Sequence, residues 1–206
     1  MAGFEVLDII NEPTAAAVAY GTQSGFLSAE GTSDKPLRVV VYDLGGGTFD
    51  VTVMEIRGAQ YNTLATDGDV HLGGIDWDQH LVNLVAEQFL REHGVDPRED
   101  LRTAGKLWRE CEDAKRTLSA RTKAQIPCDY RGFSSRIEIS RQQFEEATQH
   151  LLDRTRFTVG QTIQAAGLQW NQIDRVLLTG GSTRMPMVRA MIRESFGKEA
   201  DASVAA

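Results

Sequence analysis

Three consecutive glycines lie between two aspartates in the segment DLGGGTFD, residues 43–50, and this combination is suited to binding phosphate. Glycines let the backbone approach a ligand closely and adopt positive φ, so that successive N–H groups can point at phosphate oxygens. Thr48 adds a hydroxyl. Asp43 and Asp50 are anionic and cannot bind phosphate directly, but Mg²⁺ prefers oxygen ligands and keeps several waters, so they suit a magnesium ion beside the phosphates. An ordinary glycine-rich hairpin with solvated carboxylates is the alternative, and this segment alone leaves both interpretations open.

A second pair of glycines occurs in TGGSTR, residues 179–184, between an apolar segment and a helical one. Gly-Gly permits close approach of the backbone, and a helix N-terminus favours negative charge. The alternative is a tight strand–helix turn in which Ser182 or Thr183 caps the helix. A third pair, in HLGG at residues 71–74, is interpreted as a simple loop–helix junction, and His71 as a structural residue.

A polar helix face is the third candidate. Glu112, Arg116 and Ser119 are spaced i, i+4 and i+7, and Lys115 lies three residues after Glu112, so they share one face. A carboxylate and a lysine suit ribose hydroxyls, and a guanidinium can stack on a base. From the residues alone, a solvated face with an ion pair is the favoured interpretation.

The elements that must position these residues are strands followed by long helices. Apolar and β-branched segments predict strands over residues 3–10, 37–44, 48–56, 61–68, 122–130, 134–140 and 174–179. Apolar stripes at helical spacing predict helices over residues 14–20, 76–93, 98–119, about 141–166 and 184–196. The first helix is expected to stop at Gly21 and the second at Gly94, and Leu101 is expected in the apolar stripe of the third.

The order of these elements predicts an α/β protein whose chain leaves a sheet and returns to it. The base of a lobe is expected from residues 37–72 and 150–206, and an inserted α+β subdomain from residues 73–149. Residues 22–36 are expected to be a flexible connection.

Composition excludes several classes of function. The chain of 206 residues has 41% hydrophobic residues and a net charge of −7, which argues against nucleic-acid binding. The two cysteines, Cys111 and Cys128, form neither a disulfide framework nor a zinc motif, so a reducing cytoplasm is expected. No apolar run approaches the roughly 18 residues of a membrane helix, and the N-terminus is not a signal peptide, so no membrane partner is expected.

Five segments, in this order, resemble the heat-shock protein 70 family of chaperones, DnaK type: INEPTAAAVAYG, VYDLGGGTFDVTV, GDVHLGGIDWD, CEDAKRTLS and LLTGGSTRMP. The resemblance covers essentially the whole chain. It implies the actin-like ATPase fold, with its ribonuclease-H-like motif, in which ATP or ADP with Mg²⁺ lies in a cleft between two lobes. It also implies a chaperone whose ATP hydrolysis drives binding and release of unfolded polypeptides, with J-domain co-chaperones and nucleotide exchange factors as partners.

The resemblance also implies roles for individual residues. The second phosphate-binding loop matches Gly45, Gly46, Gly47 and Thr48. Asp43, Asp50 and Glu12 match carboxylates that act on the water shell of the magnesium ion and on the attacking water. The same three residues and Thr48 are therefore the implied catalytic residues. The adenosine-binding turn matches Gly180, Gly181, Ser182 and Arg184, and Gly74 is added to the nucleotide-binding set. The nucleoside face matches Glu112, Lys115, Arg116 and Ser119, which overrules the solvated-face interpretation.

Departures from the family pattern accompany the resemblance. Ile75 stands where the family usually has an acidic residue, and the strand pair around Pro127 looks shortened. The family's first phosphate hairpin, a catalytic lysine and the substrate-binding domain are not found in these 206 residues. The chain is therefore expected to be a piece of an ATPase domain, with residues 1–21 as the tail end of the first lobe, and not to turn over ATP alone.

Two other functions stay open on the same fold. A sugar kinase or a filament former of the actin-like superfamily is one, although no sugar pocket with its own catalytic aspartate is found. An interaction module that no longer hydrolyses or binds nucleotide is the other, and the intact glycines and the intact face from Glu112 to Ser119 weaken it.

Overall fold

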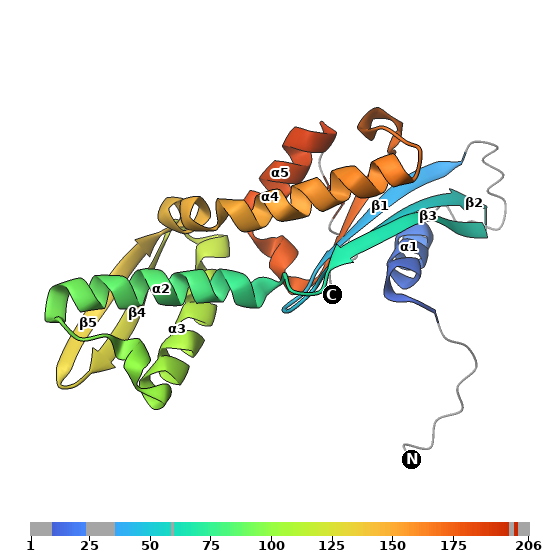
Figure 1. The fold of residues 1–206 in the computed structure, drawn as a ribbon. Coiled ribbons are helices and arrows are strands. Elements are labelled where there is room, and N and C mark those ends of the chain that lie inside the picture. The colour runs from blue at the N-terminus through green and yellow to red at the C-terminus, as the bar shows by residue number, and fades with distance from the viewer. Residues whose placement is uncertain (1–9, 24–35, 59, 198–199, 202–206) are drawn as a thin grey trace, which may run out of the picture.

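The computed structural model describes residues 10–23, 36–58, 60–197 and 200–201 (Figure 1). The strand expected over residues 3–10 and the connection expected over 22–36 lie outside the described residues, apart from their end residues. None of the helices in the described part of the chain has both the length and the apolar character that crossing a membrane requires.

A four-stranded sheet contains β1 (Leu37–Leu44), β2 (Phe49–Arg57), β3 (Gln60–Asp69) and β6 (Arg175–Thr179) in the order β3-β2-β1-β6. β1 pairs with β2 in antiparallel register, so the hairpin predicted around the three glycines is confirmed. β1 also pairs with β6 in parallel, and Asp43 is the register partner of both Asp50 and Thr179. The pairing therefore brings the two glycine segments, which are more than 130 residues apart in sequence, to one edge of the sheet.

Helices cover both faces of this sheet because β1 is apolar on both faces. Val39 and Val41 pack with α1 (Glu12–Gln23), whereas Val40 and Tyr42 belong to the core beneath α4 (Arg141–Ala165). Figure 1 shows α1 and α4 on opposite sides of the strands. The prediction that Gly21 ends the first helix is wrong, because α1 continues to Gln23; one glycine inside a helix costs only about 1 kcal/mol.

The middle of the chain forms α2 (Gly74–His93), α3 (Leu101–Ala120), and the hairpin of β4 (Lys123–Tyr130) and β5 (Phe133–Ser140). α2 ends where predicted, with Gly94 in the left-handed conformation at φ 72°. The placement of Leu101 in the core is wrong: its side chain is 89% exposed, and Leu107 is buried instead. Leu101 is the first residue of α3, after the Asp100 cap and the short helix η1 (Pro97–Glu99), and at this end the helix extends beyond the core.

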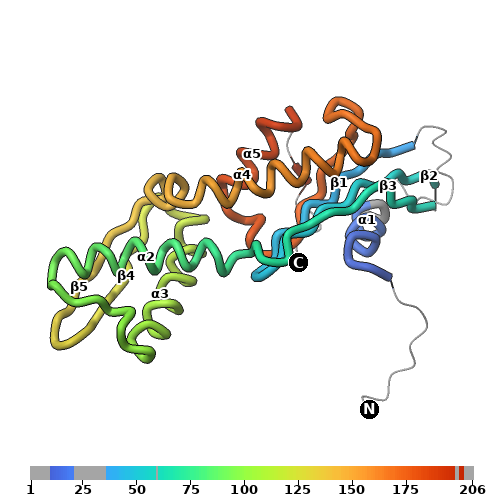
Figure 2. Tube along the Cα trace, in the orientation of Figure 1, coloured from blue at the N-terminus to red at the C-terminus, as the bar shows by residue number. Residues whose placement is uncertain are grey.

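α4 connects the two groups of elements, since its unbroken 25 residues pack against the sheet and against α2 (Figure 2). After the short helix η2 (Trp170–Gln172) and β6, residues Gly181–Arg184 form the 3₁₀ helix η3. The closing helix α5 (Pro186–Phe196) therefore begins two residues later than predicted, because η3 occupies the expected first turn.

Candidate functional site

The loop between β1 and β2 is open to solvent on the side where a ligand would approach. Gly45 N–H donates to the Thr48 carbonyl at 3.0 Å, which closes the turn. A Cβ built on Gly46 or Gly47 would meet no atom within 4 Å. The expectation of positive φ here is wrong, because none of the three glycines adopts the left-handed conformation. Gly46 and Gly47 are exposed and carry no side chain, so a ligand can approach their backbone, and glycine relieves no backbone strain here.

The double glycine at Gly73 and Gly74 docks directly onto this loop. Gly74 N–H donates to the Gly45 carbonyl at 3.0 Å, and Ile75 N–H donates to the Gly46 carbonyl at 2.8 Å. A Cβ on Gly73 would lie 2.4 Å from the Gly47 nitrogen, which leaves no room for a side chain. The interpretation of HLGG as a simple loop–helix junction is therefore incomplete, because the segment fixes the loop on the start of α2.

The segment from Gly180 to Ser182 reaches the same loop from β6. Gly180 has φ 84°, and a Cβ there would lie 2.3 Å from the Leu44 carbonyl oxygen. The Ser182 hydroxyl donates to the Gly45 carbonyl at 2.9 Å. The alternative in which Ser182 or Thr183 caps the following helix is wrong, since the residue before α5 is Met185 and no side chain caps it.

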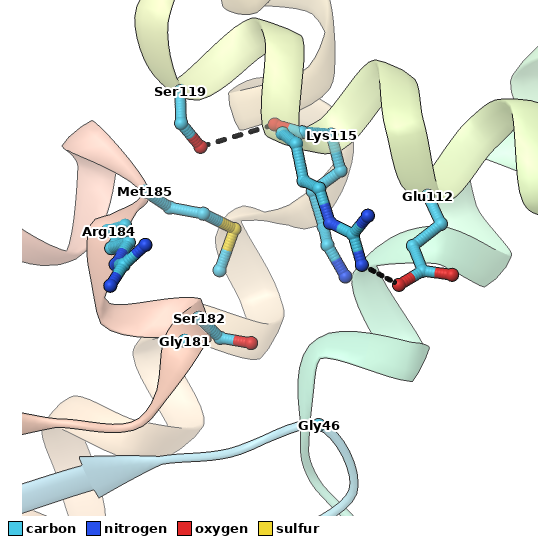
Figure 3. A pocket seen from close by; sticks show the side chains of 9 residues that line it. Gly46, Glu112, Lys115, Ser119, Gly181, Ser182, Arg184 and Met185 are labelled. Carbon is cyan, nitrogen blue, oxygen red and sulfur yellow. Dashed lines mark hydrogen bonds and ion pairs between the residues drawn. The ribbon is translucent and has the colours of Figure 1, made fainter. Parts of the chain in front are cut away.

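A cavity of about 440 Å³ lies between α3 and η3, with the loop of Gly46 at one end (Figure 3). Its volume falls within the roughly 300–1,000 Å³ that small-molecule sites occupy. The lining residues are Gly46, Glu112, Lys115, Arg116, Ser119, Gly181, Ser182, Arg184 and Met185. The structure thus brings the predicted helix face and the predicted turn to opposite walls of one cavity, as Figure 3 shows.

The remaining predicted residues lie around this cavity without lining it. Gly45 and Gly74 are held in the junction beneath the loop, and Gly180 packs against β1. Met185 was not predicted; it is 2% exposed and follows η3, and nothing in its type or spacing signals a ligand.

Arg116 forms an ion pair with Glu112 one helical turn earlier, and both residues line the cavity. The side chains are 68% and 41% exposed. Exposed pairs of this kind contribute only about 0.2–1 kcal/mol, so either partner can exchange the pair for a ligand contact at little cost.

Lys115 is held differently, by a buried partner. Its Nζ lies 2.7 Å from Asp78 Oδ2 and donates to the Gly74 carbonyl at 2.8 Å. Burial raises the pKa of the Asp78 carboxyl above its usual range, although Lys115 opposes that shift. An ammonium has three N–H donors, so one donor of Lys115 stays available to the cavity.

Asp78, the partner of a residue that lines the cavity, was not predicted from the sequence. A signal was present: Asp78 lies at i−3, i−4 and i−7 from Leu81, Val82 and Val85, on the apolar stripe of α2. A carboxylate on a buried stripe requires a charged partner, which here is Lys115.

Three carboxylates gather beneath the first loop. The pKa of Asp43 is raised to about 6 by burial, then by the charge and hydrogen bonding of Glu12 and the charge of Asp50. Within residues 10–23, 36–58, 60–197 and 200–201, no three His, Cys, Asp or Glu side chains are arranged to hold a metal ion directly. The mutual repulsion of these carboxylates favours a cation nearby, and the arrangement suits one held through its water shell.

Comparisons with known proteins identify the family to which the whole chain belongs. A family model described as "Hsp70 protein" matches residues 1–206. The "Chaperone protein DnaK" of Thermosipho africanus is 43% identical over 210 residues, covering 99% of this chain and 34% of the relative. The protein of the same name from Thermus thermophilus is 45% identical over 212 residues, covering 99% of this chain and 33% of the relative. The chain thus spans about a third of the length of these curated relatives.

Proposed function

Because the chain belongs to the Hsp70 family, we propose that it is the ATP- and ADP-binding lobe of a molecular chaperone. The family has the actin-like ATPase fold, and the mixed α/β architecture is consistent with it. The observation that carries the proposal is the cavity with the glycine loop at one end and the charged face of α3 along one wall. Because the chain belongs to the Hsp70 family, we set aside the alternatives of a sugar kinase and a filament former.

The nucleoside occupies the cavity between α3 and η3. Arg116 on α3 and Arg184 in η3 both line the cavity and suit the two faces of a planar base, because guanidinium groups stack on aromatic rings. Glu112 and the free donor of Lys115 suit the ribose hydroxyls, and Ser119 suits a polar edge of the base.

The phosphates extend from the nucleoside towards the loop of Gly45, Gly46 and Gly47. The bare backbone of Gly46 and Gly47 lets N–H groups approach phosphate oxygens, and the hydroxyl of Thr48 adds a donor. Ser182 and the buried Gly74 hold this loop in place from two sides by donating to the Gly45 carbonyl, while Gly180 packs against Leu44 and Gly181 lines the cavity.

Magnesium fits the carboxylates Asp43, Asp50 and Glu12. Burial contributes most to the raised pKa of Asp43, and the charges of Glu12 and Asp50 add to it; a divalent cation would relieve that repulsion. The three carboxylates would hold the ion by accepting hydrogen bonds from its bound waters, and would orient a nearby water. When bound, Mg²⁺ neutralises charge on the phosphate oxygens.

The wider assignments are proposals of the same kind. We propose that residues 37–72 and 150–206 are the base of the lobe, that 73–149 are an inserted subdomain, and that 1–21 belong to the first lobe. In the whole protein, ATP hydrolysis drives binding and release of unfolded polypeptides, in the cytoplasm, with J-domain co-chaperones and nucleotide exchange factors as partners.

Isothermal titration with Mg·ADP tests the nucleoside assignment, with Arg116→Ala as the variant and Arg109→Ala as a matched control on the same helix, outside the cavity lining. A cation–π contact contributes about 0.5–2 kcal/mol, so Arg116→Ala should weaken ADP binding by about twofold to thirtyfold. Inorganic phosphate should bind both variants equally. Failure of the unmodified chain to bind ADP, or an equal loss in Arg109→Ala, contradicts the proposal.

A further inference from the structure

A buried ion pair beside the proposed nucleoside site joins α2 to α3. Lys115 Nζ on α3 donates to Asp78 Oδ2 on α2 at 2.7 Å, and the two side chains are 13% and 4% exposed. Lys115 lines the cavity, whereas Asp78 does not. A ligand in the cavity can therefore touch Lys115, and Asp78 acts on that ligand through Lys115.

Folding stability does not by itself account for this pair. Burying two charges costs free energy that their attraction often only balances, and apolar residues of similar volume can be as stable in the same place. Lys115 also donates to the carbonyl of Gly74, the first residue of α2, although a helix N-terminus disfavours positive charge. The ammonium is thus placed where α2 gains nothing from its charge, so its position calls for another explanation.

Asp78 and the Gly74 carbonyl together fix the ammonium in one place. A Cβ on Gly74 would lie only 3.0 Å from Lys115 Nζ, so the ammonium packs closely over the bare backbone. Two of its three N–H donors are used by these acceptors, and their directions determine where the third donor points. Within the described part of the chain, the other carboxylate oxygen of Asp78, Oδ1, is buried without a hydrogen-bond partner, so Asp78 depends on Lys115 in turn.

Glu112 is a competing partner for Lys115. It lies three residues earlier on the same face of α3 and also lines the cavity. Burial raises the pKa of Asp78, Lys115 opposes that shift, and the charge of Glu112 adds to it, so the two carboxylates are close enough to interact. Without Asp78, the flexible lysine stem would let the ammonium turn to Glu112, and two groups suited to ribose would then be occupied with each other.

We propose that Asp78 is a positioning residue for the nucleoside, which directs the third donor of Lys115 to a ribose hydroxyl and keeps Lys115 from pairing with Glu112. The inference rests on the proposed function, because it takes an adenine nucleotide as the ligand of the cavity. The hydrogen bond from the ammonium to the ribose is charge-assisted and disappears when the ribose hydroxyls are removed. Asp78 therefore contributes to the preference for ribose over dideoxyribose and leaves the phosphate contacts unchanged.

Calorimetric titration of Mg·ADP and Mg·2′,3′-dideoxy-ADP tests the inference, because the two ligands differ only in the ribose hydroxyls. The unmodified chain should bind ADP about tenfold to a hundredfold more tightly, as expected for one hydrogen bond from a charged group. Asp78→Asn should reduce this preference about fivefold or more, because a neutral amide holds the ammonium less firmly than a carboxylate. A purely structural role would weaken both ligands equally and leave the preference unchanged.

Asp129→Asn is the matched control. Asp129 pairs with Lys106 of the same helix at 2.9 Å, but both side chains are half exposed and lie outside the cavity lining. This variant should keep the preference of the unmodified chain. Asp78→Asn/Lys115→Met removes both charges of the buried pair together, so it tests the inference even if Asp78→Asn alone fails to fold, and it should show the reduced preference.

The outcomes separate this inference from the proposed function. A chain that binds neither ligand refutes the proposed function and this inference with it. A chain that binds ADP and dideoxy-ADP equally well refutes this inference alone, and so does an Asp78 variant that keeps the full preference for ADP. A loss of preference in Asp129→Asn as large as that in Asp78→Asn also overturns it, because the effect would then follow from charge removal anywhere near α3.

Discussion

Gly73 and Gly46 lie on the two sides of one backbone contact, and alanine should affect folding stability at Gly73 but ligand binding at Gly46. Gly73 has φ −160°, an extended conformation that any residue adopts, so alanine there introduces crowding without backbone strain. Its Cβ would lie 2.4 Å from the Gly47 nitrogen and 2.5 Å from the Gly46 carbonyl group, which are backbone atoms that cannot rotate away. The loop must therefore move off α2.

The movement breaks the hydrogen bonds from Gly74 to Gly45 and from Ile75 to Gly46. At about 0.5–1.5 kcal/mol each, they account for roughly 1–3 kcal/mol. Loss of glycine from the unfolded chain returns about 0.4–1 kcal/mol. Gly73→Ala should therefore lower the unfolding free energy by about 1–2 kcal/mol and Tm by roughly 2–8 °C.

Gly46→Ala is the matched comparison, because its Cβ meets nothing within 4 Å. Its stability should stay within about 0.5 kcal/mol of wild type, while Mg·ADP binding weakens because the methyl group stands where phosphate approaches. Urea unfolding and calorimetric titration measure the two effects separately. If Gly73→Ala unfolds like wild type, or if Gly46→Ala loses the larger share of stability, the docking of HLGG on the loop has been assigned the wrong role.

Three further changes test other parts of the molecule. Asp78→Ala leaves Lys115 unpaired, so urea unfolding should show a loss of about 3 kcal/mol, and adding Lys115→Met should recover part of it; equal losses in the single and double variants would contradict the pairing. Burial, and then the charge of His150, lower the pKa of His80, although Asp76 opposes the shift. The folded state then binds fewer protons than the unfolded state, so stability should fall as the pH drops through about 6.5, and His150→Gln should reduce that slope in thermal unfolding. The pKa of Asp43, raised to about 6, predicts that Mg²⁺ binding weakens as the pH falls through that value, and calorimetric titration at pH 5.5 and 7.5 measures it.

Local patterns in the sequence predicted the elements well where periodicity and turn chemistry agree. The three glycines indicated a hairpin, and Gly94 marked the end of α2. The helix spacing of Glu112, Lys115 and Ser119 predicted a shared face, which lines one cavity. These predictions succeed because each depends on residues within a few turns of one another.

Contacts between segments that are distant in the sequence could not be predicted from these local patterns. No local sequence pattern indicates that HLGG packs against the first glycine loop, because the contact depends on the position at which β3 ends and α2 begins. The prediction of positive φ in the loop was wrong for a related reason. Gly46 and Gly47 have ordinary backbone angles and face open space, and local sequence does not indicate where such space lies. Leu101 fits the apolar period of α3 but lies beyond the end of the core.

One carbonyl group joins the walls of the cavity. The Gly45 oxygen accepts from Gly74 N–H at the start of α2 and from the Ser182 hydroxyl in η3. Lys115 on α3 then reaches the Gly74 carbonyl, so a continuous set of hydrogen bonds runs from η3 through the loop to the opposite wall. The nucleoside proposed to lie between Arg116 and Arg184 would connect the two ends of this set of hydrogen bonds. Rotation of α2 and α3 away from η3 would then break ligand contacts and the Gly45 contacts together. Because a ligand stabilises only the state that binds it, nucleotide should therefore stabilise this junction more than any other part of the sheet.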